Sequence, residues 1–394
     1  MATWQLRRFT NPAVLATIRP RHLQRFLGPY RDYLAGRGVP WPDRPDDPFD
    51  LATLIAVFAT PTEATPDDLT TALYLVDESA TPDVMDALLA AAQRLGLGLD
   101  AAEQSPADVA LQFWFADRAQ LERRHAEAHA FRARSFTSFR SARPAGPRPG
   151  AGPGEYLPRL ERRLDDWFEA HNRGRGCRVF TLDRDGERWF VVRHGEPFRR
   201  EESLRDAGPA TVSYRPLAYD AVVLSGDETE LRVHAGSDGA RRLYRDAWGG
   251  ELFGDEDAFA GTAKYTLAPL RDLGAAALAA ADVPGIDWVK LREVQVLLPG
   301  EDWEVRVHRA QDLYRLWGLR GQGFPADGRL VEAAFDVRFA AAARPRRVVV
   351  RPPNVARFLR DEDAGPCEAW LAARGFALRP TDEPDGPGGS GGRR

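Results

Sequence analysis

The chain has 394 residues, of which 43% are apolar, and this is enough for two or three domains that each bury a core. No apolar run approaches the roughly 20 residues of a membrane span, and the N-terminus lacks the apolar segment of a secretory signal, so we expect a cytoplasmic protein. The cysteines, Cys177 and Cys367, lie far apart and in no metal or redox spacing. This argues against a disulfide framework and a cysteine zinc site, and both cysteines are expected in a core.

The basic charge is almost entirely arginine, because Lys264 and Lys290 are the only lysines. With abundant Ala, Gly and Pro, this composition suggests a GC-rich bacterial genome. The net charge of −4 is unevenly distributed: residues 45–117 carry fourteen acidic side chains and one arginine, whereas residues 118–163 carry eleven arginines and four glutamates. An acidic stretch is therefore followed directly by a basic one.

Residues 1–141 are predicted to form an all-α domain. Three of the predicted helix starts share one chemistry, because Thr65, Thr81 and Ser105 are each followed by proline and then by a carboxylate within the first turn. A hydroxyl at the N-cap accepts a hydrogen bond from the first turn, and the carboxylate faces the positive end of the helix dipole. Helix capping thus explains much of the acidity of this region.

The last helix of this domain is predicted from about Pro106 to Phe139, and its second half interleaves arginines with phenylalanines. Arginines beside aromatic rings can grip phosphates and stack on bases. Two alternatives remain open: the phenylalanines face the core and the arginines form a solvated face, or the arginines bind an acidic protein partner. The candidate nucleic-acid-binding residues are Arg123, Arg124, Arg132, Arg134 and Arg140.

Residues 142–154 are rich in Pro and Gly and predict a flexible linker, and residues 155–379 predict a β-rich domain that starts with a helix over 155–171. The clearest signal is a hairpin of strands 178–182 and 188–192 around Asp185-Gly186, and a second hairpin joins 219–224 to 230–234. Further strands are expected at 289–298, 303–308, 330–339 and 346–351, with helices at 309–318 and 366–374. The fold class is therefore α+β with a mostly antiparallel sheet, followed by a disordered tail, 380–394.

The tetrapeptide Arg193-His194-Gly195-Glu196 ends the second strand of the first hairpin. It resembles the signature of the histidine phosphatase superfamily, over about five residues of this chain. The resemblance implies that His194 is a phosphorylated nucleophile, that Arg193 binds the phosphoryl group, that Glu196 belongs to the motif and that His234 is the second histidine. The alternative is a histidine at the rim of a sheet with no catalytic role.

His125 and His129 are four residues apart on one predicted helical face, which is the spacing at which two histidines can bind one metal ion. No third ligand is evident, so we expect surface histidines and no metal. Phosphate-binding loops, dinucleotide fingerprints, GxSxG elbows and Cys-His pairs do not occur, and no cofactor is expected. The acidic run 361–363 precedes a predicted helix and is interpreted as the charge complement of its N-terminus.

These patterns favour a non-enzymatic bacterial protein over an enzyme. We expect it to bind a macromolecular partner, either nucleic acid or another protein subunit, through arginine-rich surfaces around residues 123–143 and 338–360. A chain of this kind is often one subunit of a larger system, of which phage defence is an example. The phosphatase resemblance is the alternative function, and no membrane is expected as a partner. The sequence does not identify a small-molecule ligand.

Overall fold

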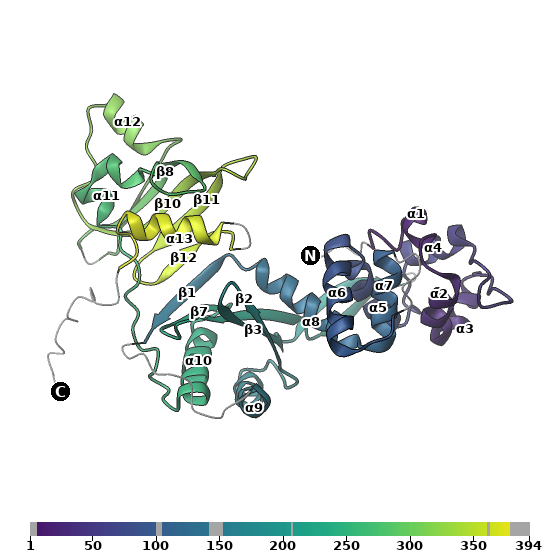
Figure 1. Cartoon of the computed structure of the whole chain (residues 1–394). Helices are drawn as coiled ribbons and strands as arrows, with labels where there is room; N and C mark the ends of the chain where they lie inside the picture. Colours follow the sequence, from purple (N-terminus) through teal and green to yellow (C-terminus); the bar gives the residue numbers. More distant parts are fainter. Residues whose placement is uncertain are drawn as a thin grey trace. The chain divides into compact units, whose positions relative to one another are not determined.

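The computed structural model describes residues 6–99, 105–141, 153–205, 208–300, 302–360 and 363–378. Their contacts group into two compact units: the first runs to Ala128 and includes Glu201–Val212, and the second comprises His129–Arg200 and the chain from Ser213 onward. The predicted α+β class is confirmed (Figure 1). Most of the predicted linker, 142–154, and the predicted tail, 380–394, lie outside the described residues.

The first unit is built mainly from helices that pack around one apolar core. Its centre is α7, in which every residue from Ala107 to Phe113 is buried, as expected of a helix surrounded on all sides. Its helices are α1 (Pro12–Leu15), α2 (Pro20–Leu27), η1 (Gly28–Tyr30), α3 (Arg31–Gly36), α4 (Leu51–Ala59), α5 (Asp67–Ser79), α6 (Pro82–Leu95), α7 (Pro106–Ala116) and α8 (Arg118–Phe131), the last of which contains the boundary between the units.

Two of the three predicted helix caps are confirmed. The hydroxyls of Thr81 and Ser105 each accept a hydrogen bond from the backbone N–H three residues later, at 3.2 and 3.1 Å. The prediction for Thr65 is wrong, because α5 begins at Asp67 and Pro66 occupies its N-cap position. The Thr65 hydroxyl accepts instead from the N–H of a residue before it in the same loop, at 2.8 Å.

The second unit contains a ten-stranded antiparallel sheet in the order β2-β3-β6-β7-β1-β12-β11-β10-β8-β9. The strands are β1 (Ser135–Arg140), β2 (Arg178–Arg184), β3 (Glu187–Gly195), β6 (Leu217–Leu224), β7 (Glu230–His234), β8 (Ile286–Leu297), β9 (Val305–Arg309), β10 (Arg329–Phe339), β11 (Arg346–Arg351) and β12 (Val355–Arg357). A separate two-stranded sheet pairs β4 (Arg199–Arg205) with β5 (Gly208–Tyr214), and most of it, Glu201–Val212, belongs to the first unit. Both predicted hairpins are present, and Asp185 and Gly186 have the positive φ angles, 53° and 78°, that the β2–β3 turn requires.

Strand β1 corrects the prediction that one helix continues to Phe139. The helical region is two helices, α7 and α8, and the chain then turns into a strand that pairs with β7 on one side and with β12 on the other. The segment alternates in the way a strand requires, because Phe136 lies on the face opposite Phe139 and both rings are buried. Because both faces of this segment pack against other parts of the unit, it forms a strand and does not continue the helix that precedes it.

Helices cover opposite faces of the two halves of this sheet. On the β2–β7 half, α9 (Pro153–Ala170) and α10 (Asp238–Trp248) enclose a core that includes Phe139. On the β8–β12 half, a second core lies on the other face, and α11 (Pro269–Asp272), α12 (Leu313–Leu319), α13 (Ala364–Ala373) and η3 (Gly274–Leu278) contribute to it. A short π-helical turn, η2 (Gly249–Phe253), follows α10.

Because the helices cover opposite faces of the two halves, one face of β11 and β12 has no helix over it among the described residues. Val348, Val350 and Ala356 point into the second core, so the alternate residues on these strands point the other way. Arg347 and Arg351 are among them, and both are exposed. Among the described residues, no helix is both long and apolar enough to cross a membrane.

Candidate nucleic-acid interface

A groove lined by arginines lies where β1, β11 and β12 meet. Its volume is about 710 Å³, and we call it the arginine groove. Five arginines and one glutamate line it, with a largely apolar floor between them. The charged residues are Arg134, Arg346, Arg347, Arg351, Arg357 and Glu332, and the floor is formed by Ser135, Val349, Val355, Phe358 and Leu359.

The strand register creates this lining. Val349 is directly opposite Arg357, and Arg351 is directly opposite Val355, so arginine and valine alternate across the β11–β12 pair. Ser135 on β1 is opposite Arg357 on its other side. Because side chains that are paired across strands lie on the same face, the arginines stand around the two valines.

Three of the five guanidinium groups bind carboxylates of the same chain. Arg346 contacts Asp363 at 2.7 Å, Arg347 contacts Glu293 at 2.8 Å, and Arg351 donates to Glu332 through Nε at 3.0 Å.

Arg134 and Arg357 differ from these three, because neither side chain has a carboxylate partner among the described residues. Both are exposed, and the two segments are adjacent, since the N–H of Phe358 donates to the carbonyl oxygen of Arg134 at 3.0 Å. Two positive charges that line one groove, without a carboxylate partner among the described residues, favour an anion at this end.

Glu293 on β8 sets the charge balance beside the groove. Its carboxylate is nearly inaccessible, with 4% of the side chain exposed, and it accepts hydrogen bonds from Arg309 at 2.7 Å, Arg347 at 2.8 Å and Gln295 at 3.0 Å. Chiefly through the hydrogen bond from Arg309, these donors lower the pKa of Glu293 from 4.5 to about 2. The carboxylate is therefore ionised at neutral pH, where it pairs with both Arg309 and Arg347.

The structure does not bring the five predicted arginines together in one groove. Arg123 and Arg124 belong to the first unit, and Arg124 is ion-paired with Glu127 at 2.9 Å. Arg132, Arg134 and Arg140 belong to the second unit, and of the five only Arg134 lines the arginine groove.

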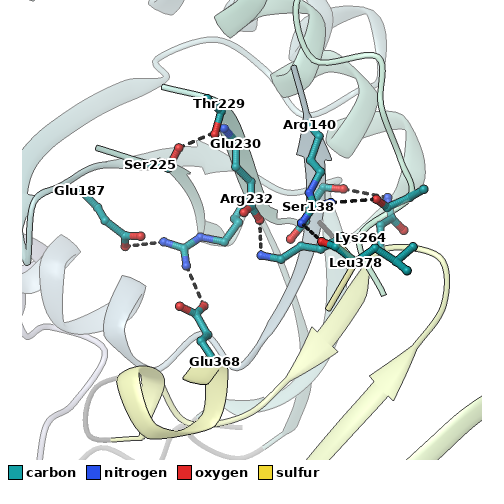
Figure 2. Close-up of polar contacts among 12 residues, drawn as sticks. Ser138, Arg140, Glu187, Ser225, Thr229, Glu230, Arg232, Lys264, Glu368 and Leu378 are labelled. Atoms are coloured by element: carbon teal, nitrogen blue, oxygen red, sulfur yellow. Dashed lines mark hydrogen bonds and ion pairs between the residues drawn. The ribbon is translucent and has the colours of Figure 1, made fainter. Parts of the chain in front are cut away.

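Arg140 has a structural role (Figure 2). It donates to the carbonyl oxygens of Leu378 at 2.7 Å and Ala263 at 3.3 Å, and its side chain is half-buried. The same figure shows Arg232 between Glu187 and Glu368. Polar residues alternate with Leu231 and Val233 along β7, a pattern that predicts a solvent-exposed Arg232, but the residue is 4% exposed because the second face of β7 is also covered.

His194 is buried rather than projecting from the rim, with 2% of the residue exposed. Its Nε2 lies 3.0 Å from a carboxylate oxygen of Asp220, which also accepts from the hydroxyl of Tyr244 at 2.8 Å, and its ring stacks on Phe168. This is a satisfied polar cluster inside the core formed by α9 and α10.

The other residues of the phosphatase resemblance do not converge on His194. His234 lies opposite Ala221, on the face of the sheet that points away from Val222 and His194. Arg193 is also on that second face, since it is the next residue along β3. Glu196 is paired with Arg199 at 2.7 Å.

His125 and His129 have separate neighbours. The Nδ1 of His125 contacts a carboxylate oxygen of Glu78, and the ring of His129 stacks on Tyr219. Within the described part of the chain, no three His, Cys, Asp or Glu side chains are placed to hold a metal ion. Cys177 and Cys367 are both buried, and burial raises the pKa of each thiol.

The groove arginines other than Arg134 were indicated by the sequence only as part of the arginine-rich stretch 338–360. The pattern Arg346-Arg347-Val348-Val349-Val350-Arg351 signals a strand with charge at its ends and could have singled them out, but their position next to β1 depends on long-range pairing. No protein-family model matches the chain, and no curated protein is significantly similar to it.

Proposed function

We propose that the protein binds nucleic acid through the phosphate backbone, and that the arginine groove is the binding surface. The observation that carries the proposal is a cavity of about 710 Å³ with five arginines and one glutamate in its lining, in which Arg134 and Arg357 have no carboxylate partner among the described residues. Guanidinium groups bind phosphate oxygens through paired hydrogen bonds, and such contacts supply most of the affinity for a nucleic-acid backbone.

The floor of the groove offers apolar contacts to a bound nucleotide, in addition to the charged contacts of the arginines. Val349 and Val355 are half-buried between the arginines, so an incoming ribose or base edge would cover apolar surface while its phosphates meet the guanidinium groups. These contacts meet phosphate and sugar, which every nucleotide carries. The proposed binding is therefore to the backbone and is sequence-tolerant.

Fluorescence anisotropy with labelled oligonucleotides of about 20 nucleotides, as single-stranded DNA, single-stranded RNA and duplex DNA, tests this proposal. At about 50 mM salt we expect binding, with log Kd rising linearly with log salt because counterions are released. Replacing both Arg134 and Arg357 by Gln should weaken binding at least tenfold and reduce the salt slope by about two.

Arg162→Gln is the matched control, because it removes one exposed positive charge from α9 in the same unit. It should change the affinity less than twofold. An unmodified chain that binds none of the three oligonucleotides would refute the proposal and leave an acidic protein partner as the remaining candidate. Equal losses in the control and the double variant would show that the groove is not the site.

A further inference from the structure

The face of β11 and β12 that lines the arginine groove alternates arginine with valine in two directions. Along β11 the lining residues are Arg347, Val349 and Arg351, and along β12 they are Val355 and Arg357. The register sets Val349 opposite Arg357 and Arg351 opposite Val355. Charged and apolar side chains therefore alternate along each strand and also across the pair.

This alternation brings apolar surface close to every charge in the groove. Side chains directly opposite each other in an antiparallel sheet have Cβ atoms about 5 Å apart, and diagonal neighbours are about 7 to 8 Å apart. Val349 is the direct neighbour of Arg357, whose diagonal neighbours on β11 are Arg347 and Arg351. A phosphate bound by Arg357 thus has a valine within reach of the sugar and base that it carries.

The ion pairs within the chain decide where a phosphate is held. Glu293, Glu332 and Asp363 each bind one of the three groove arginines on β11. The groove arginines without a carboxylate partner among the described residues are Arg134 and Arg357. Two guanidinium groups bind few phosphates, so an extended contact with phosphates alone is not available here. A ligand needs a second source of affinity, and the valines between the arginines supply apolar surface for it.

The dimensions of the groove exclude a double helix. A volume of about 710 Å³ equals that of a cube about 9 Å on edge, whereas the major groove of B-DNA alone is about 12 Å wide. A duplex on the rim would reach the arginines, but its bases are stacked inside it and would not reach Val349 or Val355. An unpaired strand can turn a base toward the floor while its phosphate stays at the rim.

We propose that the arginine groove binds a single strand of nucleic acid, an assignment that rests on the proposed function and restricts its ligand to unpaired DNA or RNA. A phosphate lies between Arg134 and Arg357, and the attached base lies against Val349 and Val355. Contact through the face of a base is sequence-tolerant, because every base has such a face. Electrostatics alone gives the opposite preference, since a duplex carries about twice the charge of one strand per unit length.

Three DNA ligands of equal length, about 20 nucleotides, test this assignment on the unmodified chain. They are a single strand, the duplex of the same sequence, and a strand of abasic nucleotides, which keeps every phosphate and lacks the bases. In anisotropy titrations at about 50 mM salt, the single strand should bind at least tenfold more tightly than the duplex and at least fivefold more tightly than the abasic strand. Parallel titrations with the corresponding RNA strand distinguish the two sugars.

A double variant links this preference to the floor of the groove. Val349→Thr combined with Val355→Thr keeps the branched shape that suits a strand and replaces one methyl group of each side chain by a hydroxyl. It should weaken binding of the single strand at least threefold and leave its salt slope unchanged, because no charge is removed. Its affinity for the abasic strand should stay within about twofold of that of the unmodified chain.

The matched control makes the same two substitutions outside the groove, at exposed positions of β9. Val305→Thr combined with Val307→Thr should leave the affinity for all three ligands within about twofold, since these residues are 46% and 51% exposed and do not line the groove. Melting temperatures of both double variants report whether the sheet is intact. If the floor variant does not fold, the comparison of the three ligands on the unmodified chain decides alone.

The possible outcomes separate this assignment from the proposed function. A chain that binds none of the ligands refutes both. Duplex binding as tight as single-strand binding, with both lost when Arg134 and Arg357 are replaced by Gln, keeps the groove as a nucleic-acid site and refutes the single strand. Equal affinities for the normal and the abasic strand, or a loss in the floor variant that extends to the abasic strand, overturn the contact between base and valine.

Discussion

Glu293→Gln should destabilise the protein at neutral pH, and the loss should disappear in acid. The substitution keeps the size of the side chain and removes the charge that Arg309 and Arg347 share. The folded-state pKa of Glu293 is lowered from 4.5 to about 2, so the carboxylate contributes stability above pH 4.5. That contribution is lost as the pH falls toward 2.

A shift from 4.5 to about 2 corresponds to at most about 3 kcal/mol, at 1.36 kcal/mol per pH unit. The two arginine side chains are 68% and 51% exposed, so water and salt screen the interaction. We therefore expect a loss of about 1 to 2 kcal/mol at pH 7.

Urea titrations of the unmodified chain and Glu293→Gln at pH 7, 5, 4 and 3 measure this difference without adding salt. The difference should be largest at pH 7 and should shrink below pH 4.5. A difference that stays constant over this range would show that packing, not charge, explains the loss, and no difference at any pH would refute the assigned ion pairs. The same substitution releases Arg347, so it should also tighten oligonucleotide binding if the arginine groove is the site.

Three other outcomes follow from the described contacts. Thr81→Ala and Ser105→Ala should each cost about 1 kcal/mol in a denaturant titration, because each removes an N-cap acceptor, and neutral results would contradict the cap geometry. Cys177 and Cys367 should react with a thiol reagent at pH 8 only after denaturant is added, since burial raises the pKa of both thiols; rapid labelling of the native chain would argue against the buried positions. Generic phosphomonoesters should not be hydrolysed, and a turnover that His194→Ala abolishes without loss of stability would restore the phosphatase interpretation.

The hairpins could be predicted because their signals are local. Asp185 and Gly186 supply the φ angles of the turn, and alternating apolar residues on either side specify the paired strands. The caps at Thr81 and Ser105 are predicted equally well by their local sequence. The cap at Thr65 is not, because Pro66 occupies the N-cap position of α5. The local sequence therefore predicts the position of a helix or hairpin better than it predicts the first residue of that element.

The face of each strand and the groove could not be predicted, because both depend on pairing between distant segments. The pattern around Arg232 indicates a side exposed to solvent, yet Glu368 on α13, 136 residues away, binds it there. Likewise Arg134 and Arg357 line the same groove only because β1 pairs with β12. His194 was placed correctly at a strand end, but Asp220 and Phe168, which enclose it, come from other elements.

The position of β1 has a consequence for how the chain acquires its structure. This six-residue strand is made first but lies between β7 and β12, and its contact with the loop before β12 joins Asn354 to Ser138 across 216 residues. Contacts between residues that are far apart in the sequence slow folding, because the entropy cost of closing the long loop comes before the contacts that stabilise it. During synthesis, β1 cannot pair with β12 until nearly all of the intervening chain has been made. Refolding of the sheet should therefore be slow, and a chain truncated before β12 should expose a strand edge that promotes aggregation.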